Sequence, residues 1–153
     1  MAEPISFPST TKNLGLPLLF SGQAQKEFTI NQSFAVLDIL TRGSVQETRD
    51  EPPTEAQDGQ CFLVSENAIG DWTGHSGQIA ARVAGSWHFV DASEGMEIYD
   101  LAAGQKRIFK SEWQVPSTPA QAQGGNVVDA EARALLADLI SSLRSAGIFA
   151  DPE

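Results

Sequence analysis

The middle of the chain alternates between short apolar runs and polar clusters, which predicts β-strands joined by tight turns. Between residues 58 and 90, apolar or alternating segments are separated by groups of Gly, Asn and Asp. Segments of the same kind continue to residue 115. Short strands without long helical crossovers between them favour an antiparallel sheet. The predicted strands are residues 61–64, 78–83, 86–90 and 95–100, followed by one or two strands over 107–110 and 112–115.

A helical region is predicted before this sheet, over residues 21–42. Ser21 is the candidate cap of a short first helix, and Asn31 is the candidate cap of a second one. Gly43 should end the second helix, because glycine readily adopts the left-handed conformation that terminates helices. The predicted inner face of this helix consists of four apolar residues: Phe34, Leu37, Ile39 and Leu40.

A last helix is predicted over residues 130–146, capped by Asp129 and ended by Gly147. Its apolar residues follow a 4-3-4-3 spacing that forms a narrow seam: Ala132, Leu136, Leu139, Leu143 and Ala146, broadened by Leu135 and Ile140. A helix of little more than two heptads is marginal by itself, so something must bury the seam. Docking on the same domain, self-association around a symmetry axis and contact with another protein are all open at this point.

These elements predict an α+β protein with a small antiparallel β-sheet body, an N-terminal helical region and a separate C-terminal helix. Residues 1–13 are rich in Pro, Ser and Thr and read as an extended arm. The compact body is expected over residues 14–115, with an acidic surface loop at 47–58. A Pro/Gly linker over 116–128 then leads to the terminal helix at 129–147.

Composition narrows the classes of protein. The 153 residues suffice for one domain with a core, and they carry 20 acidic against 10 basic residues, a formal net charge of −10. This balance argues against nucleic-acid binding, which needs a clustered basic surface. A single cysteine, Cys61, excludes an intrachain disulfide. The sequence shows neither a signal peptide nor a membrane span, so we expect synthesis in the cytoplasm without membrane insertion.

The polar residues of the turn at 71–77 invite a catalytic or metal-binding interpretation, which their spacing does not favour. Asp71, His75 and Ser76 are near neighbours, whereas catalytic triads normally gather groups from distant segments. His75 and His88 stand alone as metal ligands, without a nearby cluster. Turn hydrogen bonding is the favoured role, so we expect no enzyme activity, cofactor or metal. A small hydrolase centred on His75 is the alternative to test.

Three tryptophans offer a second kind of site. Trp72, Trp87 and Trp113, with His75 beside them, are candidate glycan contacts, because sugars stack on exposed aromatic faces. The same residues suit core packing in a small sheet, which is the favoured interpretation. A carbohydrate-binding module is therefore the alternative function.

The chain resembles a small family, labelled a domain of unknown function, found in phages and gene transfer agents of alphaproteobacteria. The resemblance covers roughly residues 14–113 and includes a GLP segment, a GQAQKE block and a later WxGHxGxIA pattern. The motif residues are Gly15, Pro17, Gln23, Gln25, Lys26, Asn31, Trp72, Gly74 and His75.

The resemblance implies a structural virion protein that helps a particle attach to its host's surface. Because the chain lacks the long shaft or tip of a complete fibre, the expected role is the base or adaptor of a capsid head spike or tail fibre. The implied partners are other copies of the chain in a symmetric trimer or pentamer, capsid or tail proteins, a separate fibre protein and host polysaccharide. The expected oligomerisation or partner contacts are on the last helix: Leu135, Leu136, Leu139, Ile140 and Leu143.

Overall fold

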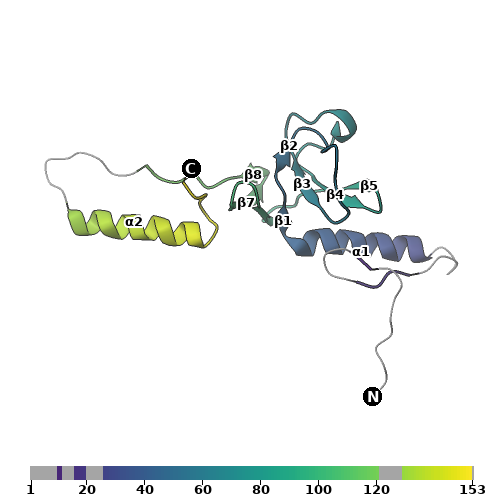
Figure 1. Cartoon of the computed structure of the whole chain (residues 1–153), viewed down its shortest axis with the longest axis horizontal. Helices are drawn as coiled ribbons and strands as arrows, with labels where there is room; N and C mark the ends of the chain where they lie inside the picture. The colour runs from purple at the N-terminus through teal and green to yellow at the C-terminus, as the bar shows by residue number, and fades with distance from the viewer. Residues whose placement is uncertain (1–9, 12–15, 20–25, 121–128, 153) are drawn as a thin grey trace, which may run out of the picture.

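The fold is α+β, with an N-terminal helix, two small sheets and a separate C-terminal helix, as the sequence predicts (Figure 1). The computed structural model describes residues 10–11, 16–19, 26–120 and 129–152. The elements are α1 (Lys26–Arg42), β1 (Ser44–Val45), β2 (Thr48–Arg49), β3 (Cys61–Val64), a 3-10 turn (Gly70–Trp72), β4 (Ile79–Val83), β5 (Ser86–Val90), β6 (Glu97–Asp100), β7 (Gln105–Lys110), β8 (Glu112–Gln114) and α2 (Ala130–Ser145).

The strands form two four-stranded sheets, in the orders β2-β3-β4-β5 and β1-β6-β7-β8. Hairpin neighbours pair antiparallel, as predicted, but β1 pairs with β6 and β2 with β3 in parallel. The predicted antiparallel body is therefore mostly confirmed, but the strands divide into two sheets, each with one parallel pair, and the segment predicted as a surface loop over residues 47–58 contains β2. Strands of two residues carry no periodicity of their own, so their pairing depends on partners elsewhere in the chain.

Strand β3 lies at the centre of the body, and all four of its residues are buried. Successive side chains of a strand point to opposite faces, so β3 contributes to two cores. Cys61 and Leu63 pack in a cluster that also contains Ile39 of α1 and Ile98 of β6. Phe62 and Val64, on the other face, form a second cluster that includes Trp72 and Ala80.

Helix α1 is one continuous helix to Arg42, and Gly43 ends it with a φ of +61°, which confirms the predicted stop. The prediction that Asn31 caps a second helix is wrong, because Asn31 lies inside α1. Its side-chain amide instead donates to the carbonyl of Leu19 at 3.1 Å and accepts from the Leu19 N–H at 2.9 Å. The candidate cap Ser21 lies outside the described residues.

The predicted inner face of α1 is also partly wrong. Ile39 is buried, but Leu37 and Leu40 are 48% and 39% exposed. The face turned to the body is mixed, since it contains the buried Asp38 as well as Ile39. Asp38 accepts a hydrogen bond from Thr11 Oγ1 at 2.9 Å, so this helix face holds a piece of the preceding chain as well as the sheet.

Helix α2 stands apart from the sheets, at the opposite end of the molecule from α1 (Figure 1). Before it, residues 115–120 have no regular secondary structure, and residues 121–128 of the predicted linker lie outside the described residues. Of the predicted arm, Thr10 and Thr11 are described, and Thr10 forms an isolated bridge with Pro17. Among the described residues, no helix is both long and apolar enough to span a membrane.

Candidate functional site

The ends of α2 are fixed by local chemistry that the sequence predicts correctly. The Asp129 side chain accepts a hydrogen bond from the backbone N–H of Ala132 at 2.9 Å, which satisfies one of the donors left open at a helix N-terminus. Gly147 follows the helix with a φ of +70°, a conformation that costs glycine little. The helix therefore forms where its own residues specify it.

The apolar seam of α2 faces outward over most of its length. Leu135, Leu136 and Leu139 are 69%, 52% and 53% exposed, whereas Ile140 and Leu143 are half-buried. None of the residues of α2, all of which the structure describes, is buried. We therefore define the α2 seam as Leu135, Leu136, Leu139, Ile140 and Leu143.

A groove runs along this seam. Its walls are α2 on one side and Thr118, Pro119, Ala120 and Phe149 on the other, and its volume is about 500 Å³. Half-buried Leu143 and Ile140 line it together with Leu136 and Leu139. An apolar groove of this size next to exposed leucines suits a helical partner better than it suits water.

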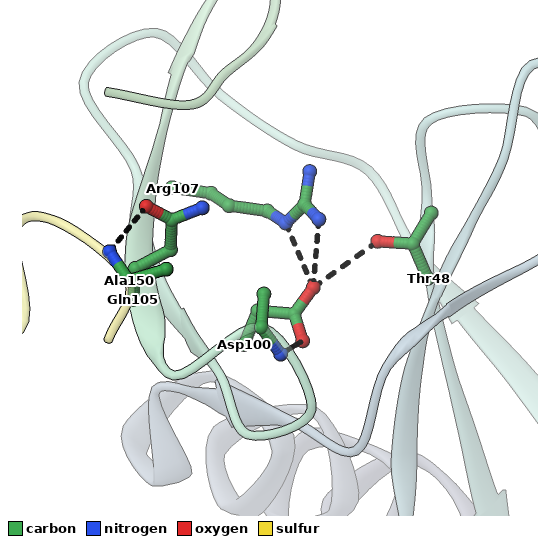
Figure 2. Close-up of polar contacts among 6 residues, drawn as sticks. Thr48, Asp100, Gln105, Arg107 and Ala150 are labelled. Carbon is green, nitrogen blue, oxygen red and sulfur yellow. Dashed lines mark hydrogen bonds and ion pairs between the residues drawn. The ribbon is translucent and has the colours of Figure 1, made fainter. Parts of the chain in front are cut away.

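The chain after α2 attaches the helix to the body. The carbonyl of Gly147 accepts from the N–H of Lys106 at 2.6 Å. The N–H of Ala150 donates to Gln105 Oε1 at 3.1 Å, as Figure 2 shows. A Cβ at Gly147 would lie 2.8 Å from the Tyr99 ring, so only glycine allows this close approach. These contacts fix the C-terminal end of α2 at the hairpin between β6 and β7.

A buried ion pair stiffens that hairpin. Asp100 is 1% exposed, and its Oδ2 accepts from Nε of Arg107 at 2.9 Å and forms an ion pair with Nη2 at 2.8 Å (Figure 2). Thr48 Oγ1, on β2, also donates to Oδ2 at 3.3 Å, while Oδ1 accepts from the N–H of Ala103. The carboxylate thus joins the two sheets, and Asp100 is the register partner of Gln105, to which the C-terminal segment is attached. Sequence reasoning missed this network, because its members look like ordinary surface charges.

The tryptophans do not form a shared platform. Trp72 is 0% exposed and meets Trp87 edge to face, with centroids 5.1 Å apart and planes at 87°. Its complete burial removes Trp72 from the candidate glycan contacts. Trp87 is half-buried with the Arg82 guanidinium 5.3 Å from its ring centre, and half-buried Trp113 donates from Nε1 to the carbonyl of Gly77 at 2.8 Å. Glycan contact at these two residues stays a prediction.

His75 has structural contacts on its ring. The imidazole stacks on Phe89, with centroids 3.6 Å apart and planes at 5°, and Nδ1 lies 2.6 Å from Gln78 Oε1. The neighbouring Gly74 and Gly77 have φ values of +86° and +76°, which explains glycine on both sides of this turn. The motif residues Trp72, Gly74 and His75 therefore shape one turn that closes over the second core.

The described ones among the remaining motif residues belong to α1 and to the chain before it. Pro17 bridges Thr10, Asn31 holds Leu19, and Lys26 is the first residue of α1. Gly15, Gln23 and Gln25 lie outside the described residues. The described members position the chain that precedes α1 rather than a reactive group.

Two kinds of reactive group can be checked among the described residues: a metal-binding cluster and the cysteine thiol. In the part of the chain that the structure describes, no three His, Cys, Asp or Glu side chains gather as a metal site would require. Burial raises the pKa of the Cys61 thiol to about 11, against the opposing effect of Arg42, so the thiol is protonated and a poor nucleophile at neutral pH.

A cavity that the sequence does not predict lies between α1, the segments around Thr11 and Leu19, and β4. It measures about 620 Å³, and its lining mixes carboxylates such as Asp38 with apolar residues such as Val83. Loosely filled space between a helix and a sheet depends on side-chain fit, which no local pattern encodes.

Among the comparisons with known proteins, one finds a match, to a protein family. No curated protein matches the chain. A family model described as "Protein of unknown function (DUF2793)" matches residues 30–114, which is more than half of the chain and includes both sheets and the turn at His75 but not α2. The chain therefore belongs to the DUF2793 family of proteins of unknown function.

Proposed function

We propose that the protein is a structural, non-enzymatic component of a phage-like particle, the base or adaptor of a capsid head spike or tail fibre, and that it self-associates through α2. The observation that carries the self-association is the exposed α2 seam, where three leucines are each more than half exposed. An exposed apolar stripe at heptad spacing is typical of a helix that packs against another helix. The placement in a phage-like particle rests on the resemblance of the sequence motifs.

The way α2 is attached supports a connecting role. Its C-terminal end is held at the β6–β7 hairpin by the contacts of Gly147 and Ala150, while the helix itself extends away from the sheets (Figure 1). The rigid attachment gives the seam a defined direction, which reduces the entropy lost when it meets a partner. A subunit that joins a particle to an appendage needs such an element.

The non-enzymatic part of the proposal has its own support. His75 is stacked and hydrogen-bonded within a turn, and Cys61 is a buried, protonated thiol. These are the two side chains that a hydrolytic mechanism would most readily use. Both instead have contacts that stabilise the body.

The test replaces Leu136 and Leu139 together with Gln and measures the oligomeric state by light scattering. The wild-type chain should form a multimer, and the double variant should remain a monomer with an unchanged body. Ser141→Gln, on the exposed opposite side of α2, is the matched control and should assemble like the wild type.

A second measurement addresses the particle. Antibodies against the chain should label purified particles at a capsid vertex or on the tail. A wild-type chain that stays monomeric at high concentration, together with its absence from purified particles, would contradict the proposal.

A further inference from the structure

Helix α1 carries a second apolar face that points to solvent. Ile30, Leu37 and Leu40 are 38%, 48% and 39% exposed, and exposed Ser33 lies between them. Positions 30, 33, 37 and 40 have a 3-4-3 spacing, which lines up on one side of a helix. We call these four residues the outer face of α1. Ile30 and Leu37 lie opposite the side on which Ile39 enters the core, while Leu40 lies at the edge of the outer face and also lines a small pocket with Ile39.

The outer face has a shape that suits a helical partner. A shallow, open hollow on it is lined by Gln32, Ser33, Val36, Leu37 and Leu40. Exposed leucines beside a hollow provide both a knob and a hole, which are the two parts of helix packing at heptad spacing. The α2 seam offers the same combination, with exposed leucines next to its groove.

The α2 of the same chain is held away from this face. The contacts of Gly147 and Ala150 with the β6–β7 hairpin attach α2 at the end of the molecule opposite α1 (Figure 1). Reaching α1 would require breaking them. As long as these contacts persist, the α2 seam cannot reach the outer face of its own chain. An α2 seam that packs on this face must therefore belong to a second copy.

Charge also favours this pairing. The chain carries a net charge of −10, which makes copies repel one another over most of their surfaces. Each helix, however, contains two acidic and two basic residues: Lys26, Glu27, Asp38 and Arg42 in α1, and Glu131, Arg133, Asp138 and Arg144 in α2. Contact between the two helices therefore joins neutral elements of an acidic protein.

We propose that the α2 seam of one copy packs on the outer face of α1 of another copy. This inference rests on the self-association proposed above and names the surface that receives the seam. Pairing seam with seam would leave the outer face of α1 exposed, whereas pairing seam with outer face buries both. Such a contact joins two different surfaces, so it forms a ring or a reciprocal pair where the rotation between copies closes, and an open filament where it does not.

A complementation experiment tests the pairing. The first variant, Leu37→Gln with Leu40→Gln, keeps α2 and blocks the outer face; the second, Leu136→Gln with Leu139→Gln, does the reverse. Each variant alone should self-associate about 100-fold more weakly than the wild type, because both substitutions remove central apolar contacts. Mixed together, they should form a one-to-one heterodimer by light scattering, since one intact seam then meets one intact outer face.

Two controls accompany the mixture. Ser141→Gln on α2 changes an exposed position on the side of the helix away from the seam and should assemble like the wild type. Photo-leucine incorporated into the wild-type chain avoids variants altogether. Intermolecular cross-links between the segment around Leu37 and the segment around Leu139 should appear, even if the α1 variant folds poorly.

The outcomes separate this inference from the proposed function. If the α1 variant assembles like the wild type, or if cross-links join α2 to α2 alone, the pairing is wrong while self-association through α2 stands. If the wild-type chain stays monomeric at high concentration, both the pairing and the self-association are wrong. Monomeric variants that combine into a heterodimer support both.

Discussion

The β3 strand and the α2 helix have comparable runs of apolar residues but opposite surroundings. All of β3 is buried, because neighbouring strands satisfy its backbone on both sides and its alternating side chains enter two cores. In α2, fully described, no residue is buried, and its leucines gather on one side that the body does not cover. The same residue type therefore stabilises the monomer in one region and is available to stabilise an assembly in the other.

Matched leucine substitutions give the largest contrast between these regions. Leu63→Ala should lower the free energy of unfolding by about 4 kcal/mol, because it leaves a cavity in a closed core. Leu139→Ala should change the monomer's unfolding free energy by less than about 0.5 kcal/mol, as expected for an exposed site. Urea titration followed by tryptophan fluorescence measures this, since all three tryptophans lie in the body. Equal losses for the two variants would contradict the contrast.

A second contrast compares the stability contributed by a buried ion pair with that contributed by a partly exposed one. Asp100→Asn should lower the unfolding free energy by about 3 kcal/mol, because Arg107 would keep a largely buried charge without its carboxylate. Glu47→Gln is the matched control: it removes the charge from the partly exposed pair with Arg49, whose atoms are 2.8 Å apart, and should cost less than about 0.5 kcal/mol. Similar costs for both substitutions would show that the Asp100 network does not join the sheets as strongly as its burial indicates.

Alkaline pH provides a third probe of the closed core. Burial raises the folded-state pKa of Cys61 from 9.0 to about 11, so the folded state holds the proton more tightly than the unfolded state. The associated stability is full below pH 9 and is lost as the pH rises through 11, by about 3 kcal/mol in total. Unfolding free energies measured from pH 8 to 11 should fall more steeply for the wild type than for Cys61→Ala. Parallel curves would argue against a protonated, buried thiol.

The smallest expected effect is confined to α2. Asp129→Ala removes the cap and should destabilise the helix by about 1 kcal/mol. Hydrogen exchange should show faster exchange in the first turn of α2, while the amides of β3 keep their protection. Loss of protection throughout β3 would mean that α2 and the body unfold together, and the comparison between the two regions would then fail.

Some elements could be predicted from the sequence alone, because the residues that specify them are close together in the chain. The apolar alternation placed β3 and β5 at their observed bounds, and Asp129 with Gly147 placed α2 to within a residue. Caps, turns and strand periodicity depend on residues a few positions apart, so a single segment contains all the information that they need. The heptad spacing of the α2 seam belongs to this group, but its exposure does not, because docking of the helix on the same domain was equally open from the sequence.

Contacts between distant segments, by contrast, became known only from the tertiary structure. Residues of α1 form apolar groups on two sides of the helix, and periodicity cannot tell whether Ile39 or Leu37 faces the core. The parallel pairing of Ser44 with Tyr99 joins residues far apart in the chain, and the burial of Trp72 depends on packing against Phe62 and Trp87. These outcomes follow from side-chain fit between distant segments, which is settled only when the whole chain is packed.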